Sequence, residues 1–299
     1  MKGTGEKGSS MMKMQLVPIV KPLVEHFPKL AMTYRRWRDN CQFICSKPEE
    51  TQAGFKFIGN KAMRKGMFQA EETEVIKNLL NKVDVLVNVG ANIGYYCCIA
   101  LSLDKSVVAF EPIALNLKYL LANIIVNNWR DKIEIFPLAL SNKVGVIEIY
   151  GGGTGASLVK GWAGTPEQYV SLVPTSTMDI VLGSRFQDRR CLVLVDIEGS
   201  EKLMLEGASS FLCAKLKPIW MVEISISEHQ PKGVNINPNL YDTFQIFWDR
   251  GYETFTANTQ CRQVYPDEVE NILRTGKNTF VTHNFLFIER GRKAELLDA

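Results

Sequence analysis

"LVNVGANIGYYCCIA", residues 86–100, places two glycines four residues apart between two apolar runs. The overlapping stretch VDVLVNVG (83–90) predicts a strand buried on both faces, and IGYYCCIALSL (93–103) predicts a helix. In a doubly wound sheet, ligands bind at the carboxyl ends of the strands, so the turn between this strand and this helix is a natural ligand cradle. Gly90 and Gly94 would let the backbone approach a ligand there.

Strands and helices alternate along the rest of the chain. The sequence predicts strands at 106–112, 132–140, 145–153, 191–199 and 218–225, and helices at 71–82, 114–128, 200–208 and 240–250. The last strands, 252–257 and 284–290, have only a loop between them and are expected to pair at an antiparallel edge. The alternation predicts an α/β fold, a Rossmann-like doubly wound sheet that is mostly parallel with an antiparallel C-terminal edge.

Charge divides the chain into a basic leader and an acidic body. Residues 1–38 contain five Lys and three Arg against two Glu, whereas the whole chain has a net charge of +3. We expect a leader and helical extension over 1–53, with short helices between prolines, and one domain over 54–299. The acidic body argues against a nucleic-acid substrate. The leader is either a solvated tail or a peripheral membrane contact, and no run is apolar enough to span a membrane.

The seven cysteines show no disulfide or metal spacing. Cys97, Cys98 and Cys191 lie in apolar stretches and are expected to be buried free thiols, which indicates a reducing compartment, the cytoplasm.

Glu111 ends the second predicted strand, 21 residues after Gly90. A carboxylate at that place accepts hydrogen bonds from a ribose diol, so the pattern indicates a nucleoside-containing cofactor. The turn G-A-N-I-G lacks the third glycine of the dinucleotide fingerprint G-x-G-x-x-G. S-adenosylmethionine is therefore favoured over a nicotinamide dinucleotide.

Six segments, in order, resemble the FkbM-type S-adenosylmethionine-dependent methyltransferases: VNVGANIGYY, AFEPIALNLKYLLANIIVNN, PLALSNKVGVIEIY, STMDIVL, VLVDIEGSEKLMLEGA and MVEIS. The resemblance runs from about residue 54 to 290 and implies a class I methyltransferase architecture. Such proteins methylate hydroxyls, often on sugars or polyketide-like natural products. The acceptor implied here is a small molecule or a glycan.

The resemblance also implies roles for particular residues. Gly90, Ala91, Asn92 and Gly94 would line the methionine part of the cofactor, Glu111 with Pro112 would hold the ribose, and Ala139 and Leu140 would lie near the adenine. Asn88 stands in the same cofactor-binding strand where the family commonly has Asp, and Val195 stands where Lys is common.

Methyl transfer to a hydroxyl needs a base that removes the proton. The candidates at strand ends are Asp196, Glu198, Glu223 and His229, with Asp196 the first choice. Asp196 and Glu198 alternate along one predicted strand, so both would face one side; alternatively, they stabilise the N-terminus of the next helix. No metal ligand is assigned, although Mg²⁺ held by Asp196, Glu198 and Glu223 is an alternative.

Aromatic residues offer further contacts. Trp162 and Tyr169, in or beside the glycine-rich segment 151–168, could stack on a sugar ring, whereas Trp220 is expected in the core.

Two other functions stay open. The first is a catalytically degenerate methyltransferase-like module that binds a ligand without catalysis, and the residues that support it are Asn88 and Val195. The second is a nicotinamide-dependent oxidoreductase, which would need the missing glycine. A nucleic-acid amino-methyltransferase would typically carry D/N-P-P-[YFW] after the fourth strand, where this chain has D-I-E-G.

Overall fold

The computed structural model describes residues 28–297, and the chain divides into two compact units, Met1–Ser46 and Lys47–Ala299. In the first unit, Pro28–Cys45 forms one helix, α2, where the sequence predicts several short ones. The predictions for residues 1–27, including the membrane contact of the leader, lie outside the described residues. Within 28–297, no helix is both long enough and apolar enough to cross a membrane.

The second unit contains thirteen strands and ten α-helices among its described residues. The strands are β1 (Glu49–Glu50), β2 (Lys56–Phe57), β3 (Val85–Val89), β4 (Ser106–Phe110), β5 (Ile133–Phe136), β6 (Ala139–Leu140), β7 (Gly145–Tyr150), β8 (Val170–Ser176), β9 (Cys191–Val195), β10 (Ile219–Glu223), β11 (Tyr252–Thr256), β12 (Gln263–Val264) and β13 (Asn284–Glu289). The helices are α3 (Lys61–Arg64), α4 (Ala70–Leu80), α5 (Tyr95–Ser102), α6 (Ala114–Val126), α7 (Met178–Leu182), α8 (Glu201–Glu206), α9 (Ser209–Leu212), α10 (Leu240–Trp248), α11 (Pro266–Thr275) and α12 (Lys293–Leu297).

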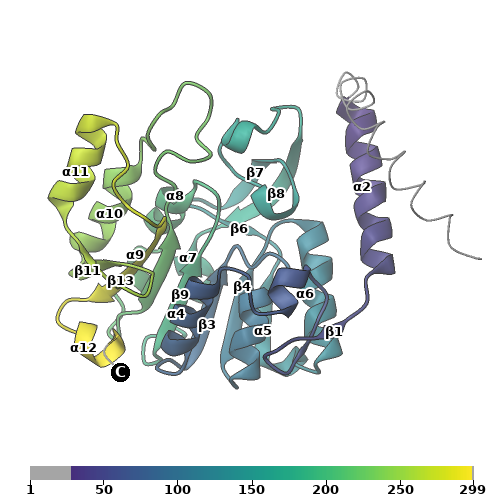
Figure 1. Cartoon of the computed structure of the whole chain (residues 1–299), viewed down its shortest axis with the longest axis horizontal. Helices are drawn as coiled ribbons and strands as arrows, with labels where there is room; N and C mark the ends of the chain where they lie inside the picture. The colour runs from purple at the N-terminus through teal and green to yellow at the C-terminus, as the bar shows by residue number, and fades with distance from the viewer. Residues whose placement is uncertain (1–27, 298–299) are drawn as a thin grey trace, which may run out of the picture. The chain divides into compact units, whose positions relative to one another are not determined.

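An eight-stranded sheet forms the centre of this unit (Figure 1). Its strand order is β12-β11-β13-β10-β9-β3-β4-β5. The strands from β10 to β5 are parallel neighbours, and β13 runs antiparallel between β10 and β11. This confirms the predicted doubly wound α/β sheet with an antiparallel C-terminal edge. The order reverses direction beside β3, so the turn after β3 lies at the place where such sheets bind ligands.

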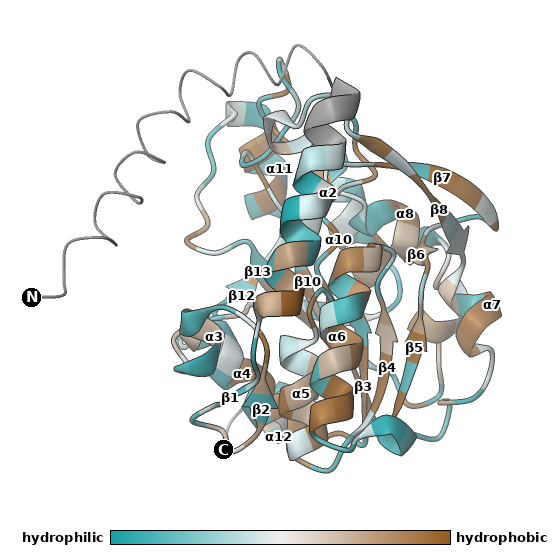
Figure 2. Cartoon of the chain, turned by 90° about the vertical axis from the view of Figure 1, so that its right-hand side faces the viewer, coloured by the Kyte–Doolittle hydropathy of each residue, from teal (hydrophilic) through white to brown (hydrophobic). Residues whose placement is uncertain are grey.

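Alternate residues of each central strand enter two separate hydrophobic cores. Val85, Val87 and Val89 of β3 pack with residues of α8 and α10, whereas Leu86 packs with residues of α4 and α5. Figure 2 shows that the central strands are largely apolar and the outer loops largely hydrophilic. Because both faces are covered, the strands read in the sequence as continuous apolar runs.

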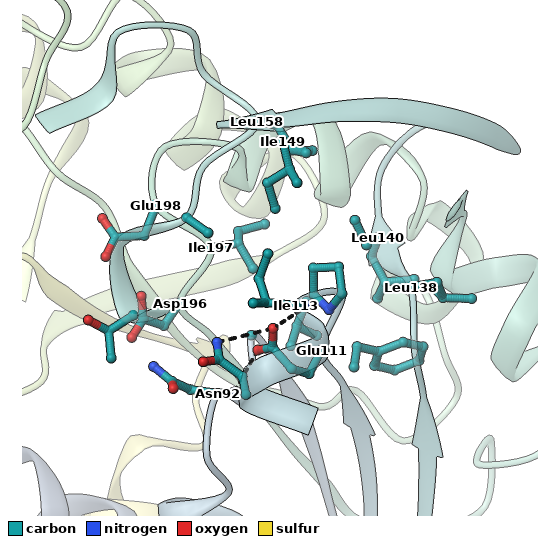
Figure 3. A pocket seen from close by; sticks show the side chains of 18 of the residues that line it. Asn92, Glu111, Ile113, Leu138, Leu140, Ile149, Leu158, Asp196, Ile197 and Glu198 are labelled. Atoms are coloured by element: carbon teal, nitrogen blue, oxygen red, sulfur yellow. Dashed lines mark hydrogen bonds between the residues drawn. The ribbon is translucent and has the colours of Figure 1, made fainter. Parts of the chain in front are cut away.

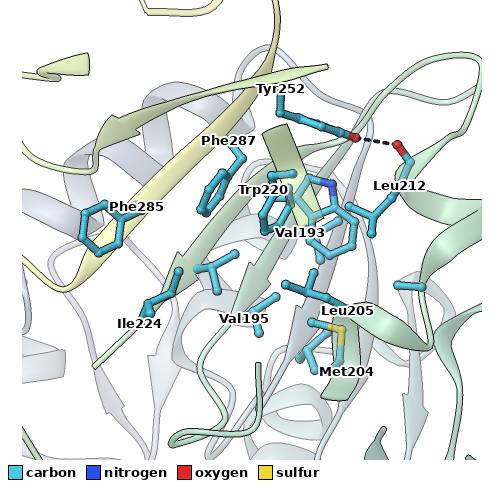
Figure 4. Packing of buried hydrophobic residues seen from close by; sticks show 14 of the residues in the cluster. Val193, Val195, Met204, Leu205, Leu212, Trp220, Ile224, Tyr252, Phe285 and Phe287 are labelled. Atoms are coloured by element: carbon cyan, nitrogen blue, oxygen red, sulfur yellow. Dashed lines mark hydrogen bonds between the residues drawn. The ribbon is translucent and has the colours of Figure 1, made fainter. Parts of the chain in front are cut away.

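Trp220 of β10 belongs to the first of these cores, as its sequence context predicts. It is fully buried and meets Phe211 and Phe247 edge to face, at centroid distances of 6.1 and 5.6 Å. The Tyr252 hydroxyl donates a hydrogen bond to the Leu212 carbonyl, 3.0 Å away, at the edge of the same cluster (Figure 4).

The strand predicted over 132–140 is in fact two strands in different sheets. β5 ends at Phe136, and β6 belongs to a three-stranded sheet of order β6-β8-β7. Pro137 separates them because proline has no N–H to donate to a ladder, and the Leu138 N–H turns back to the Phe136 carbonyl at 2.9 Å. Ala139 and Leu140 therefore end no strand of the main sheet.

The structure also contains elements that were not predicted from the sequence. The stretch before residue 191 contains strand β8, whose Pro174 argues against a strand but lies exposed on β8, opposite Val146 of β7. β11 and β13 do pair antiparallel, as expected, but α11 and β12 lie between them in the chain instead of a simple loop.

Candidate active site

The glycine turn is fixed by contacts within the protein itself. The Gly90 N–H donates to the Phe110 carbonyl at 3.0 Å, which joins the turn to the end of β4. Gly90 has φ +83°, and a Cβ there would lie 1.9 Å from the backbone oxygen of Asp196. Gly94 has φ +86°, and a Cβ there would lie 2.3 Å from Leu120 Cδ1. Gly90 is thus required by close packing against backbone, and not only by ligand approach as the sequence suggested. At Gly94 the positive φ is the main constraint, because Leu120 Cδ1 is the end of a flexible side chain.

Glu111 is a buried carboxylate directly after β4. Its Oε2 accepts a hydrogen bond from the Asn92 N–H at 2.8 Å, and its Oε1 accepts from the Ile113 N–H at 2.7 Å and from Asn116 Nδ2 at 3.3 Å. Burial raises the pKa of Glu111 to about 6, against the opposing effect of these bonds. The carboxyl group is therefore mainly ionised at neutral pH and held in one orientation.

The first cavity, of about 50 Å³, lies beside Glu111. Figure 3 shows Asp196 and Glu198 at the end of it that is remote from Leu138 and Leu140. Much of its wall is apolar, from side chains of Ile113, Leu138, Leu140, Ile149 and Leu158. A fixed carboxylate beside an apolar wall suits a nucleoside, whose base is flat and whose ribose carries hydroxyl donors.

Asp196 and Glu198 lie in the loop after β9, not on the strand as predicted. The strand ends at Val195, and Glu198 has a left-handed backbone conformation with φ +56°. Both side chains nevertheless line the first cavity. Asp196 is open to solvent through the cavity, although protein surrounds its carboxyl group on the other sides. Burial, followed by the charges of Glu198 and Glu111, raises the pKa of Asp196 to about 7.

Glu198 is held by the glycine-rich segment 151–168. Trp162 Nε1 donates to Glu198 Oε2 at 2.7 Å, and the Ser157 hydroxyl donates to the Glu198 carbonyl. Trp162 is only 2% exposed, and a Cβ at Gly199 would lie 2.5 Å from its ring. Trp162 thus packs on the D-I-E-G loop and presents no open face on which a sugar ring could stack.

The second cavity, of about 70 Å³, shares Gly90, Asn92 and Asp196 with the first. It therefore continues the site past the glycine turn. It lies between α4 and the ends of β9, β10 and β13. Its further polar lining residues are Gln69, Glu72, Asn88, Tyr95, Tyr96, Glu223 and Asn284.

Glu223, the last residue of β10, is the most strongly perturbed carboxyl group of the second cavity. Burial raises its pKa to about 9, and the nearby charges of Asp196 and Glu198 add to the effect. His283 Nε2 lies 3.8 Å from Glu223 Oε1, too far for a hydrogen bond. Glu223 is thus mainly protonated at neutral pH.

Glu201, at the start of α8, is a structural part of the D-I-E-G-S-E segment. Its side chain is buried, and it accepts a hydrogen bond from the Gly199 N–H at 2.9 Å. The Ser200 hydroxyl makes no capping bond to α8. Glu201 instead closes the loop that carries Asp196 and Glu198.

A Glu201→Gln variant is expected to be more stable than the parent above neutral pH. Burial raises the pKa of Glu201 to about 7, so the folded state holds its proton more tightly than the unfolded state. Stability is therefore lost as pH rises from about 4.5 to 7 and stays lower above that window. Glutamine keeps the acceptor without the charge, and we expect a gain of roughly 1–3 kcal/mol at about pH 8. Urea unfolding from pH 5 to 8 measures it, and an unchanged pH slope would contradict the assignment.

Most predicted cofactor residues come together at the two cavities. Gly90, Asn92, Glu111, Pro112, Ala139 and Leu140 line the first, and Asn88 and Ala91 line the second. Gly94 lines neither, because it packs against α6. Asn88 is buried in β3 and donates through Nδ2 to Cys97 Sγ at 3.4 Å.

The candidate bases separate into two groups. Asp196, Glu198 and Glu223 line the cavities, whereas His229 lines neither. His229 is exposed with φ +62°, and its carbonyl accepts a hydrogen bond from the Ala163 N–H at 2.7 Å. Over residues 28–297, no group of three or more His, Cys, Asp or Glu side chains is arranged to hold a metal ion.

Several lining residues were not predicted from the sequence. Glu72 lies on a helix that was recognised only by its apolar side, and Asn284 opens the last strand. Nothing in the local sequence marks either residue. Leu138 also lines the first cavity and could have been predicted, because it directly precedes Ala139 and Leu140.

The sequence model of the Methyltransferase FkbM domain matches residues 88–254, more than half of the chain. The matched region runs from β3 to β11 and includes Glu111, Asp196 and Glu223. No curated protein matches the chain in sequence.

Three solved structures illustrate what the chain is similar to in arrangement, at low sequence identity. A methyltransferase FkbM from Methylobacillus flagellatus KT is 16% identical with a TM-score of 0.43, covering 76% of this chain and 53% of its own length. The chain thus spans about half of that relative. A precorrin-6y C5,15-methyltransferase from Geobacter metallireducens GS-15 is 11% identical with a TM-score of 0.38, covering 66% and 77%. TYW2 from P. horikoshii in complex with MeSAdo is 13% identical with a TM-score of 0.36, covering 81% and 69%.

Proposed function

The chain belongs to the FkbM methyltransferase family, and from this premise we propose that it transfers the methyl group of S-adenosylmethionine to a hydroxyl of a sugar, glycoconjugate or related natural product. The proposal rests mainly on the position of Glu111. It is a buried carboxylate, fixed by two backbone N–H groups, on a cavity that reaches from an apolar wall to Asp196.

The residues present fit this cofactor. Glu111 would accept the hydrogen bonds of the ribose diol, and Leu138 and Leu140 would flank the adenine. Asn92 Oδ1 is buried and has no hydrogen-bond partner among the described residues, which is costly unless a ligand donates to it. When bound, S-adenosylmethionine supplies an electrophilic methyl group with a good leaving group, so the chain needs mainly to position the acceptor and take its proton.

Asp196 is the proposed general base. It is the carboxyl group common to both cavities, and its side chain makes no hydrogen bond to the described protein. A pKa of about 7 places it close to the operating pH, where a base combines a useful ionised fraction with a strong affinity for the proton. Glu198 is held by Trp162 and positions the loop, and its charge raises the proton affinity of Asp196.

Calorimetric titration with S-adenosylmethionine tests the proposal. We expect the parent protein to bind and a Glu111→Ala variant to bind at least roughly 100-fold more weakly, because charge-assisted hydrogen bonds contribute about 1.5–3 kcal/mol each. Glu111→Gln keeps one acceptor and should be intermediate. A Glu148→Ala variant, at an exposed position of β7, is the matched control and should bind like the parent.

The titration also separates the proposed enzyme from a methyltransferase-like binding module. Absence of binding by the folded parent protein would contradict the proposal and favour the binding module, with Asn88→Asp as the first variant to test. Binding that survives Glu111→Ala would place the cofactor elsewhere.

A further inference from the structure

All charged side chains that line the two cavities are carboxyl groups. Among the described lining residues there is no Lys, Arg or His. The carboxyl groups are those of Glu72, Glu111, Asp196, Glu198 and Glu223. Phosphate and carboxylate ligands are normally met by Arg, Lys or clustered N–H groups. The lining therefore disfavours an acceptor that carries a phosphate or carboxylate near its reacting hydroxyl.

Part of the second cavity also has hydrogen-bonding capacity that the protein does not use. Asn284 is only 6% exposed, lines this cavity, and its side-chain amide has no hydrogen-bond partner among residues 28–297. The carboxyl groups of Glu72 and Glu223 likewise accept no hydrogen bond from that part of the chain. Asn284 is thus a buried amide without a partner in the described part of the chain, next to two half-buried carboxyl groups that accept no hydrogen bond there. Buried polar groups are normally paired, so this arrangement points to a ligand with several N–H or O–H donors.

We propose that Glu72, Glu223 and Asn284 form an acceptor subsite for an ammonium group, so that the methylated molecule is an amino-bearing polyol such as an amino sugar. This assignment rests on the proposed function, because it places the acceptor next to Asp196. Glu72 comes from α4, Glu223 from the end of β10 and Asn284 from the start of β13, so three elements enclose the subsite.

The charges of the cofactor leave the carboxyl groups of Glu72 and Glu223 available to the acceptor. Glu111 is committed to the ribose, and Asp196 lies beside the reacting hydroxyl in the proposed mechanism. S-adenosylmethionine carries a single net positive charge, which is fewer than the four carboxyl groups that line the two cavities besides the protonated Glu223. An ammonium group on the acceptor would neutralise part of the remainder and donate hydrogen bonds, whereas an N-acetyl group would do only the second.

Proton exchange gives the subsite a measurable signature. Burial and the neighbouring carboxyl groups of Asp196, Glu198, Glu201 and Glu72 raise the pKa of Glu223 to about 9, and His283 lies 3.8 Å away. An ammonium ligand favours the ionised form, so its binding at about pH 7.5 should release a proton from Glu223. A neutral ligand should release no proton from Glu223. The affinity of the protein for the ammonium ligand should rise with pH as Glu223 ionises, until the ligand itself loses its proton.

The test uses the full chain saturated with S-adenosylhomocysteine. Three probes are titrated in two buffers of different ionisation enthalpy: the methyl glycoside of glucosamine, its N-acetyl derivative and glucosamine 6-phosphate. We expect the amine to bind at least roughly 10-fold more tightly than the N-acetyl derivative, with proton release, and the phosphate to weaken binding. Glu72→Gln and Glu223→Gln should each reduce the preference to less than about 3-fold.

Controls make each outcome decisive. Glu74→Gln changes an exposed carboxyl group two residues from Glu72 on the same helix, paired with Lys77, and should leave the preference intact. The subsite would be overturned by equal or tighter binding of the N-acetyl or phosphorylated sugar, or by no binding of the amine at millimolar concentrations. In either case the proposed function still stands if S-adenosylhomocysteine binds. Failure of S-adenosylhomocysteine itself to bind would instead overturn the proposed function.

Discussion

An Asp196→Asn variant is expected to bind S-adenosylmethionine normally and to transfer methyl groups roughly 10²- to 10⁴-fold more slowly than the parent protein. Asparagine keeps the size of the side chain but accepts no proton at neutral pH. Initial rates with radiolabelled cofactor and the best acceptor of the sugar panel measure the loss. In the parent, kcat/KM should rise with pH and level off above about 7, because Asp196 must be ionised to act.

The stability of this variant distinguishes a lost base from a damaged fold. The raised pKa of Asp196 means that the folded state destabilises its charge, so the neutral asparagine should leave the thermal midpoint unchanged or higher at about pH 8. Glu198→Gln should be milder, because the Glu198 side chain is engaged by Trp162. Near-normal turnover in Asp196→Asn together with a large loss in Glu198→Gln would assign the base to Glu198.

Part of this site could be predicted from the sequence alone. Ligand sites of doubly wound sheets lie at the carboxyl ends of strands, so Glu111, Asp196 and Glu223 were found simply as polar residues that end apolar runs. His229 fits the same rule in sequence but not in space. The chain continues past β10 into an exposed loop there, and the His229 carbonyl is used to anchor Ala163 of the glycine-rich segment.

What the sequence could not reveal depends on contacts between distant segments. Glu72 becomes part of the site only because α4 packs on α5 and borders the same cavity as the end of β9, and no pattern within 71–82 predicts that arrangement. Trp162 is similar, because its partner Glu198 lies 36 residues away. The division of 132–140 was locally encoded by Pro137, but the destination of β6 depends on β8, which sequence reasoning missed.

A Gly90→Ala variant is expected to lose more than about 4 kcal/mol of stability, or to fail to fold. At this position, alanine meets two penalties. The φ of +83° costs about 1 kcal/mol for any residue with a Cβ, and that Cβ would lie 1.9 Å from the Asp196 backbone oxygen. Urea unfolding of the purified variants, followed by circular dichroism, measures the loss.

Gly233→Ala separates these two penalties. Gly233 has φ +90°, and a Cβ there would meet no atom within 4 Å. We therefore expect Gly233→Ala to lose only about 1 kcal/mol, the cost of the backbone conformation alone. Similar losses in both variants would mean that contact with Asp196 is relaxed without cost. A much larger loss in Gly90→Ala than in Gly233→Ala would establish that the glycine turn and the backbone of the proposed base form one packed unit, so that no side chain can enter the turn without displacing Asp196.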